Sequence, residues 1–307
     1  MANFTLKQLR YFEALARHGH FGHAADSCAI SQPALSMQIK ELEEQLGTVL
    51  FERSSRQVRL SIFGEEFAQR TRKILRAVDE LDDLARVSRD QFIGRLRIGV
   101  IPTIAPYLLP TLIGKLANSH AGLDIHIRET LTQKLIQELA EGRIDTAIVA
   151  LPVSETSLTE IALFDENFVL VRPSGDAAKP APDAEALRDM RLLLLEEGHC
   201  FRDQALTFCN VQSAMPRDGL DGSSLSTLVQ MVGAGIGVTL IPEMAVQVET
   251  GSAPVSVARF RGAQPSRTVG MIWRKTSPMA RQLVQIAEIV EQSAEAMREN
   301  QARNLRQ

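Results

Sequence analysis

Cysteine, long apolar runs and an excess of basic charge are all lacking in this sequence. Only three of its 307 residues are cysteine, and they form neither a Cys-x-x-Cys pair nor a cluster with histidines, so they make a poor zinc site. No apolar run approaches the ~18 residues that span a bilayer. The N-terminal segment carries a Glu within a helical pattern, where a signal peptide has an unbroken apolar core.

From these absences we expect a cytoplasmic protein with no metal, no cofactor and no membrane contact. Thiols are normally kept reduced in the cytoplasm. The net charge is −3, and positions 1–92 hold 13 basic and 13 acidic residues. A protein that coats nucleic acid uniformly is thereby excluded, whereas a local basic surface is not. The length is enough for about two or three domains.

Residues 6–47 predict three short helices. The first is amphipathic and ends at a glycine, and the second breaks at Ala29. Ser31 then suits an N-cap, Pro33 suits the first turn, and Gly47 suits the end of a third helix. A short helix, a tight break and a helix with a polar head have the spacing of a helix-turn-helix.

The head of the third helix carries side chains of the types that read base edges in a major groove. An ordinary surface helix carries such residues too, so the next segment matters. Two short strand patterns flank residues 54–56, which predicts a basic wing suited to phosphate contacts. The candidate DNA-binding residues are Gln32, Pro33, Ser36, Gln38, Lys40, Arg53 and Arg56.

Residues 63–92 predict a long linker helix with one early glycine and no proline. Its apolar stripe is too long for the neighbouring elements to cover, which favours a partner helix in a dimer over packing within its own domain.

Residues 20–60 resemble the winged helix-turn-helix of LysR-type transcriptional regulators. The likeness includes the Ala24-Ala25 pair and Ser-Gln-Pro-Ala-Leu-Ser at 31–36. The resemblance implies an activator with a double-stranded DNA operator and RNA polymerase as partners. It also implies self-association, with the tetramer as the usual state of the family.

From Arg95 onward strands alternate with helices, which indicates parallel βαβ units. This order fits two α/β lobes joined by crossing strands, and it resembles the periplasmic-binding-protein-like effector domain of the same family. We therefore divide the chain into a winged helix-turn-helix domain at 1–62, a linker and dimerisation helix at 63–92, and a two-lobed α/β effector domain at 93–307. Strands are expected at 95–101, 123–129, 145–151, 164–173, 190–197 and 267–274, and one more is expected after the glycine-rich turn within 223–246.

Ligand sites in open α/β sheets lie outside the carboxyl ends of the strands. Three predicted strand ends are followed by residues 102–103, 130–132 and 198–200. We expect these three segments to meet at one cleft.

Cys200 and Cys209 stand nine positions apart in a segment that reads as helix. Along one helix that step rises ~13.5 Å and turns ~900°, which leaves the side chains on opposite faces. A disulfide needs Cα atoms within about 7 Å. The segment therefore has two exclusive states, a helix with two thiols or an unwound loop with a disulfide.

Cys200 also has the sequence environment of a reactive thiol. It lies in the first turn of the predicted helix, where the helix dipole favours an anion, and His199 and Arg202 can add positive charge. Peroxide would convert such a thiol to a sulfenic acid that Cys209 resolves. The alternative is two unrelated buried cysteines, which is the commoner case.

Residues 198–209 are similar to the redox segment of the peroxide-sensing OxyR subfamily of LysR-type regulators, and residues 101–110 and 164–166 match as well. The resemblance implies hydrogen peroxide as the signal, with Cys200 as the peroxidatic and Cys209 as the resolving cysteine. It also implies a peroxide pocket formed by Thr103, Thr132, His199 and Arg267.

Two rival functions stay open at this point. A LysR-type regulator that senses a small metabolite in the same cleft needs no resolving thiol at this spacing. A thiol peroxidase needs no recognition helix, so we expect a regulator and not an enzyme.

Overall fold

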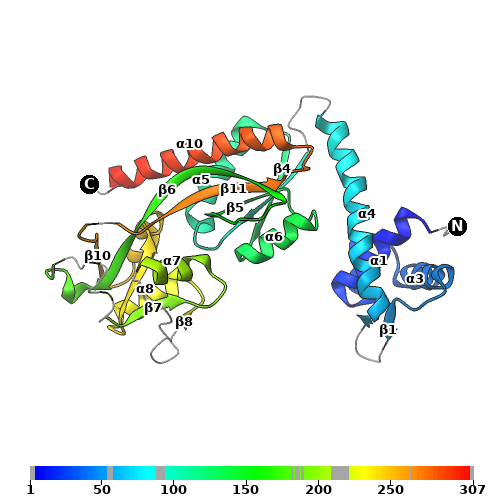
Figure 1. Cartoon of the computed structure of the whole chain (residues 1–307), viewed down its shortest axis with the longest axis horizontal. Helices are drawn as coiled ribbons and strands as arrows, with labels where there is room; N and C mark the ends of the chain where they lie inside the picture. The colour runs from blue at the N-terminus through cyan, green and yellow to red at the C-terminus, as the bar shows by residue number, and fades with distance from the viewer. Residues whose placement is uncertain are drawn as a thin grey trace. The chain divides into compact units, whose positions relative to one another are not determined.

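The structure is a computed structural model that describes residues 4–53, 58–87, 94–180, 183, 187, 190–208, 221–262 and 264–304. The chain divides into two units, residues 1–85 and 86–307, which are described separately (Figure 1). None of the helices in the described ranges is both long and apolar enough to cross a membrane.

The N-terminal unit begins with helix α1 (Leu6–His18), which a capping box starts. The Thr5 hydroxyl accepts a hydrogen bond from the Gln8 backbone at 3.2 Å, and the Gln8 side chain accepts one from the Thr5 backbone at 2.9 Å. Gly19 ends the helix at a φ of 61°. Reciprocal capping of this kind satisfies backbone donors that the first turn leaves without helical partners.

Helices α2 (Phe21–Ser27) and α3 (Gln32–Leu46) form the predicted helix-turn-helix. The turn between them places Ala29 at a φ of 53°, in the left-handed region. Ser31 then caps α3, because its Oγ accepts a hydrogen bond from the Ala34 backbone at 3.4 Å, and Gly47 ends α3 at a φ of 68°. The predicted break, N-cap and helix end are all confirmed.

A wing and a long helix complete this unit. Strands β1 (Phe51–Arg53) and β2 (Val58–Leu60) pair antiparallel, which confirms the predicted hairpin. Helix α4 (Ile62–Val87) follows. Its early glycine is needed at that place, since a Cβ on Gly64 would lie 2.1 Å from the Leu50 carbonyl oxygen. The buried core shared by these elements includes Phe12, Leu15, Leu35, Ile39, Leu42, Leu50 and Phe51.

The effector unit is built on a sheet whose strand order in the described residues is β4-β3-β5-β11-β6-β9-β7-β8, with β10 paired to β6. β3 lies parallel to both β4 and β5, as expected for βαβ units. Helices α5 (Ala105–Ser119) and α6 (Thr132–Ala140) make the two crossovers. The strands are β3 (Gly94–Val100), β4 (Leu123–Glu129), β5 (Thr146–Leu151), β6 (Leu158–Pro173), β7 (Leu192–Leu195), β8 (Asp221–Gly222), β9 (Val238–Pro242), β10 (Val255–Ala258) and β11 (Ser266–Arg274).

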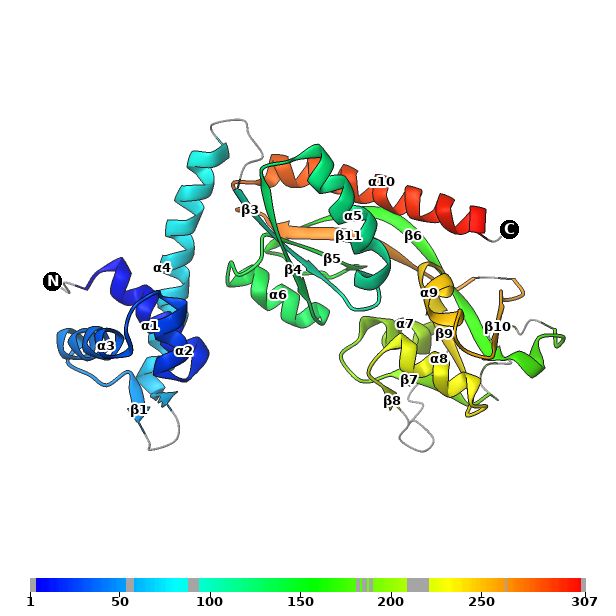
Figure 2. The ribbon, with the colours of Figure 1, turned by 180° about the vertical axis from the view of Figure 1, so that it is seen from behind.

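β6 joins the two lobes. Its first half pairs with β11, and its second half pairs with β9 and β10, so a single strand of 16 residues runs through both lobes (Figure 2). The predicted strand at 164–173 therefore begins six residues earlier. β10 was not predicted, because four residues give too short an alternation to stand out from loop.

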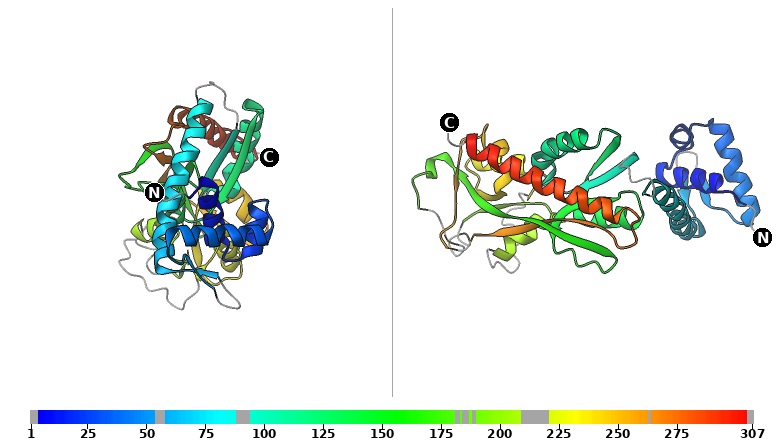
Figure 3. Two further views of the ribbon diagram at one scale, coloured as in Figure 1. Left: turned by 90° about the vertical axis from the view of Figure 1, so that its right-hand side faces the viewer. Right: turned by 90° about the horizontal axis from the view of Figure 1, so that it is seen from above.

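The remaining helices cover the sheet. Helices α7 (Cys200–Phe208), α8 (Leu225–Gly233) and α9 (Val246–Thr250) belong to the second lobe, where η3 (Glu243–Ala245) leads into α9. Helix α10 (Ala280–Asn304) runs beside α5 and across β6, where Figure 3 shows it from above. A 3-10 turn, η1 (Ser174–Asp176), follows β6.

Candidate functional sites

A cavity of about 340 Å³ lies between the two lobes of the effector unit. Pro102 and Thr103 line it after β3, Thr130 and Leu131 line it after β4, and His199 lines it after β7. Each of the three expected segments therefore contributes to the cavity, whereas Thr132, Cys200 and Arg267 are not among the residues that line it. The cavity is small, and Thr103, His199 and Ser226 are among the lining residues that carry hydrogen-bonding groups.

Gly198 lets the two lobes approach each other at this cavity. Its φ is 96°, which favours glycine, and a Cβ here would lie 3.0 Å from Cδ1 of Leu131. The close approach places the turn that carries His199 and Cys200 directly against the segment after β4.

Arg267 is the fixed charge of the site. Its Nη1 donates to Thr103 Oγ1 at 2.8 Å, its Nη2 donates to the Thr103 carbonyl at 3.0 Å, and its Nε donates to Glu166 Oε2 at 2.8 Å. The side chain has no exposed surface, and the Phe168 and Phe201 rings lie 6.0 and 5.9 Å from its guanidinium carbon. The structure thus brings Thr103 and Arg267 together, as the sequence predicted for one pocket.

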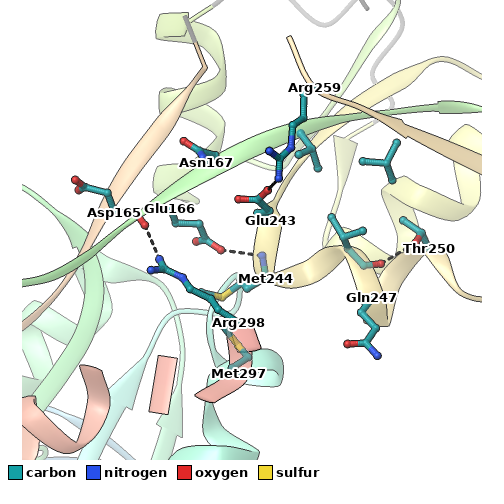
Figure 4. A pocket seen from close by; sticks show the side chains of 13 residues that line it. Asp165, Glu166, Asn167, Glu243, Met244, Gln247, Thr250, Arg259, Met297 and Arg298 are labelled. Atoms are coloured by element: carbon teal, nitrogen blue, oxygen red, sulfur yellow. Dashed lines mark hydrogen bonds and ion pairs between the residues drawn. The ribbon is translucent and has the colours of Figure 1, made fainter. Parts of the chain in front are cut away.

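Glu166 is a residue of this site that sequence reasoning did not select. One carboxylate oxygen holds Arg267, and the other accepts a hydrogen bond from the Met244 backbone at 3.0 Å (Figure 4). Glu166 also lines a second cavity of about 780 Å³. The sequence carried one signal for it, since Glu166 belongs to the Phe-Asp-Glu segment that resembles the peroxide-sensing regulators.

Thr132 and His199 bring unusual polar groups to the same region. The Thr132 hydroxyl is buried and makes no hydrogen bond within the described part of the protein. His199 is 6% exposed, and burial lowers its pKa below the usual 6.5, against a smaller raising effect of the Glu196 carboxylate. Burial thus works against the positive charge that the sequence leads us to expect from His199 beside Cys200.

Cys200 is the first residue of α7, and its half-buried sulfur forms no disulfide within the described residues. The predicted helix is confirmed over the described residues, whereas Cys209 lies outside them. Two aromatic contacts anchor the helix, from Phe201 to Phe168 at 4.7 Å and from Phe208 to Phe260 at 5.2 Å between ring centroids.

The Arg202 side chain is buried in the protein and does not extend into solvent. It is 7% exposed, and its Nη1 donates to the Leu195 carbonyl at 2.8 Å, so it ties α7 to the end of β7. Its positive charge is thereby held in the same short segment as the Cys200 thiol.

A second hydrogen-bond network joins the lobes at the cavity. The Tyr107 hydroxyl of α5 donates to Glu249 Oε1 of α9 at 2.7 Å, and the Ser226 hydroxyl of α8 donates to Glu249 Oε2 at 2.6 Å. Burial, with the Glu249 hydrogen bond second, raises the pKa of Tyr107 far above its usual value. Nothing in the sequence pattern pointed to this network.

The candidate DNA-binding residues lie on and after α3. Gln32, Pro33 and Lys40 are exposed, while Ser36 and Gln38 are half-buried. The Gln38 amide donates to Glu41 at 3.0 Å, and Lys40 pairs with Glu44 at 3.7 Å. The backbone of Arg53 lies in β1, and Arg56 lies outside the described residues.

Comparisons with known proteins bear on both sites. Residues 6–65 match the bacterial regulatory helix-turn-helix domain of the lysR family, and residues 89–294 match the LysR substrate binding domain. The chain belongs to the LysR family. Both domain matches occur in the order that the sequence predicted.

LysR-family relatives over nearly the whole chain carry names that concern peroxide. A probable hydrogen peroxide-inducible genes activator of Streptomyces viridosporus is 42% identical, over 98% of this chain and 97% of that protein. The DNA-binding transcriptional dual regulator OxyR of Escherichia coli strain K12 is 38% identical, over 93% of this chain and 94% of that protein.

Solved structures give the same picture. A full-length Pseudomonas aeruginosa OxyR with one cysteine replaced by aspartate superposes with a TM-score of 0.76 at 37% identity, over 94% of this chain and 95% of that one. A hydrogen-peroxide-bound Corynebacterium glutamicum OxyR with one cysteine replaced by serine gives a TM-score of 0.67 at 35% identity, over 95% of this chain and 93% of that one.

Proposed function

We propose that this chain is a DNA-binding transcriptional regulator that hydrogen peroxide switches through a disulfide between Cys200 and Cys209. The observation that supports it best is the position of Cys200. This thiol opens a helix directly after His199, which lines the interlobe cavity together with Thr103. The likeness to a peroxide-bound OxyR supports the same oxidant.

The proposed reaction has two steps. The Cys200 thiolate attacks one oxygen of hydrogen peroxide, the O–O bond breaks, and the sulfur becomes a sulfenic acid while the other oxygen takes up a proton and leaves as water. The Cys209 thiol then attacks that sulfur, the S–O bond breaks, and a second water leaves as the disulfide forms. Two thiols lose two electrons, and one peroxide gains them.

The pocket residues suit a small molecule that both donates and accepts hydrogen bonds. Thr103 Oγ1 accepts from Arg267, so its own O–H can donate to a peroxide oxygen. The buried Thr132 hydroxyl can do both. Neutral His199 has one donor and one acceptor nitrogen, and the buried Arg267 charge favours the anion that develops when the O–O bond breaks.

Disulfide formation requires α7 to unwind, because the helix holds Cys200 about 12 Å from Phe208, the neighbour of Cys209 in the chain, which is too far for a disulfide to form. Unwinding breaks the ring contacts by which Phe201 and Phe208 hold α7 against Phe168 and Phe260. Closing a loop of this size contributes on the order of 3 kcal/mol, so the disulfide state must also re-bury these rings or place them at a new surface. Such a surface provides a route from the local bond to the assembly of the whole regulator.

The assembly itself forms part of the proposal. The apolar stripe predicted along residues 63–92 serves a dimer, and the LysR family favours a tetramer as the complete state. Operator DNA is contacted by α3 and the wing, and RNA polymerase is the further partner of an activator in the cytoplasm. Domain boundaries at 62 and 92 remain predictions, and the division of the structure after residue 85 falls inside the proposed linker helix.

A transcription assay with operator DNA tests the switch. Parent protein and the Cys28→Ser variant should both change operator-dependent transcription after peroxide. Cys200→Ser should not respond, and Cys209→Ser should form a sulfenic acid at Cys200 without holding the switched state. Equal peroxide responses from all three variants would overturn the proposal, and a response to a bound metabolite instead of peroxide would favour the rival regulator.

The DNA face has a separate test. Substitution of Gln32 or Ser36 should relax discrimination between operator and other sequences, because base contacts specify. Substitution of Arg53 should weaken binding to every duplex and lower the salt dependence of binding, because phosphate contacts release counterions. A footprint unchanged by the Gln32 and Ser36 substitutions contradicts the assignment.

A further inference from the structure

An exposed methionine stands in the middle of the polar face of α3. Met37 is 63% exposed, although its neighbours Ser36 and Gln38 are both half-buried. The core contacts of α3 come from other positions, such as Leu35 and Ile39, which have no exposed surface. Met37 therefore has no packing role in this unit that would explain an apolar side chain there.

Met37 lies on the side of α3 that faces away from the core. At ~100° per residue, Met37 lies about 165° around the helix from the buried stripe of Leu35, Ile39 and Leu42. Pro33 is also exposed and lies within about 40° of Met37, one turn nearer the start of the helix. Long side chains on helices lean towards the N-terminus, so Met37 extends over Pro33.

We propose that Met37 reads thymine through apolar contact with its 5-methyl group in the major groove, and so contributes to the choice of operator. The inference rests on the proposed DNA binding by α3. The thymine methyl is the apolar feature that base pairs present in the major groove. A flexible, polarizable thioether adapts to such a group better than a rigid side chain does.

The surroundings of Met37 favour this occupant over a protein partner. Its neighbours on the outward face, Lys40, Glu41 and Glu44, are exposed and charged, so the apolar surface of this face amounts to little more than the Pro33–Met37 pair. A stable protein interface buries on the order of 1,000 Å² or more, which this pair cannot supply. A single thymine methyl group suits the small apolar surface of the Pro33–Met37 pair. The hydrogen-bonding base edges beside that methyl group suit the polar side chains around the pair.

The experiment replaces methyl groups one at a time. Full-length protein first selects its preferred duplexes from a random-sequence library, and each thymine of the selected site is then replaced by deoxyuridine, which removes only the 5-methyl group. At one or two positions the replacement should weaken binding by the parent about fourfold, the factor that corresponds to loss of one buried methylene-sized group. Met37→Ala should bind the thymine duplex about as weakly and lose its sensitivity to deoxyuridine, whereas Met37→Leu should stay sensitive.

Lys40→Ala is the matched control, because Lys40 is exposed on the same face but offers a charge. This variant should bind every duplex more weakly and keep the deoxyuridine effect. The inference is overturned if deoxyuridine leaves binding by the parent unchanged at every thymine, or if Met37→Ala remains as sensitive as the parent. If the library yields no enriched duplex, DNA recognition by α3 itself fails, and the inference falls with it.

Discussion

In the N-terminal unit the Arg10–Asp79 ion pair lies in solvent, whereas in the effector unit the Arg267–Glu166 pair is sealed inside. In the first pair the nitrogen and oxygen lie 3.3 Å apart, and the Arg10 and Asp79 side chains are 56% and 51% exposed. In the second pair they lie 2.7 Å apart, and the Arg267 and Glu166 side chains are 0% and 3% exposed. Solvent screens the first pair, so it can break and re-form at little cost in free energy. The second pair must persist, because either charge left alone inside the protein is strongly unfavourable.

The difference matches the tasks that we propose for the two units. A DNA-reading surface works with exposed groups that find their partners on another molecule, and α3 keeps Gln32, Pro33 and Lys40 exposed. A redox site works with groups whose positions and charges are set before the oxidant arrives. Thr103, Arg267 and Glu166 form such a set, since each holds the next through hydrogen bonds of 2.8 Å.

The largest expected effect comes from breaking the buried pair. Glu166→Ala should lower the free energy of unfolding of the effector unit by about 3–5 kcal/mol, because the Arg267 charge is left without its carboxylate. The chain has one tryptophan, Trp273, which is 2% exposed in β11, so its fluorescence during urea denaturation reports this unit.

Asp79→Ala is the matched control for the exposed pair. It should lower the free energy of unfolding of the N-terminal unit by less than about 1 kcal/mol, measured by circular dichroism of the helices. Similar losses from Glu166→Ala and Asp79→Ala would contradict the contrast between the two units.

The two threonines of the proposed pocket separate function from stability. Thr103→Val should lower the free energy of unfolding by about 1–3 kcal/mol, because Arg267 Nη1 loses its acceptor inside the protein. Thr132→Val should leave stability unchanged or raised, because the hydroxyl that it removes has no hydrogen-bond partner among the described residues. Both variants should nevertheless slow oxidation of Cys200 by peroxide, measured by stopped-flow with a thiol probe.

An unchanged oxidation rate in Thr132→Val would place the peroxide elsewhere. Binding of operator DNA by the reduced protein serves as the control, and both threonine variants should retain it, since neither residue lies in the N-terminal unit.

A smaller effect is expected at the start of α3. Ser31→Ala should lower the free energy of unfolding by about 1 kcal/mol, because the cap on the Ala34 backbone is lost, and Ser31→Gly should lower it by only a few tenths. Circular dichroism should record this loss, while the Trp273 fluorescence transition should not move. A shift of the fluorescence transition would show that the two units unfold together.

The smallest effect concerns His199 and pH. Burial lowers the pKa of His199 in the folded protein below its usual 6.5. Between that lowered pKa and pH 6.5 the unfolded chain binds more protons than the folded protein does. The free energy of unfolding therefore falls as the pH falls through this window, and the contribution of neutral His199 to stability is fully present above it. His199→Asn should therefore lose less stability than the parent between pH 7.5 and 5.5, followed by Trp273 fluorescence in urea.

Local signals explain what the sequence could predict. Ser31, Pro33 and Gly47 mark the ends of α3 through backbone preferences that act within a few residues, and the predicted strand at 123–129 is β4 to the residue. The cleft followed from a rule about strand ends, which needs only the order of the elements.

Contacts between distant positions explain what it could not. Glu166 meets Arg267 across 101 positions, and Tyr107 meets Glu249 across 142. Each of these side chains reads locally as an ordinary surface or core residue, and only the folded sheet and helices bring the partners together. The burial that lowers the pKa of His199 could likewise not be predicted from its neighbours in the chain.

The most direct test of the account counts thiols. Reduced full-length protein is treated with one equivalent of hydrogen peroxide, and its intact mass and accessible thiols are measured before and after under denaturing conditions. The account predicts a loss of two of the three thiols and two hydrogen atoms, with Cys28 still reduced and Cys200 and Cys209 joined in one peptide after digestion. Three thiols that survive the treatment, or a disulfide that includes Cys28, would contradict it.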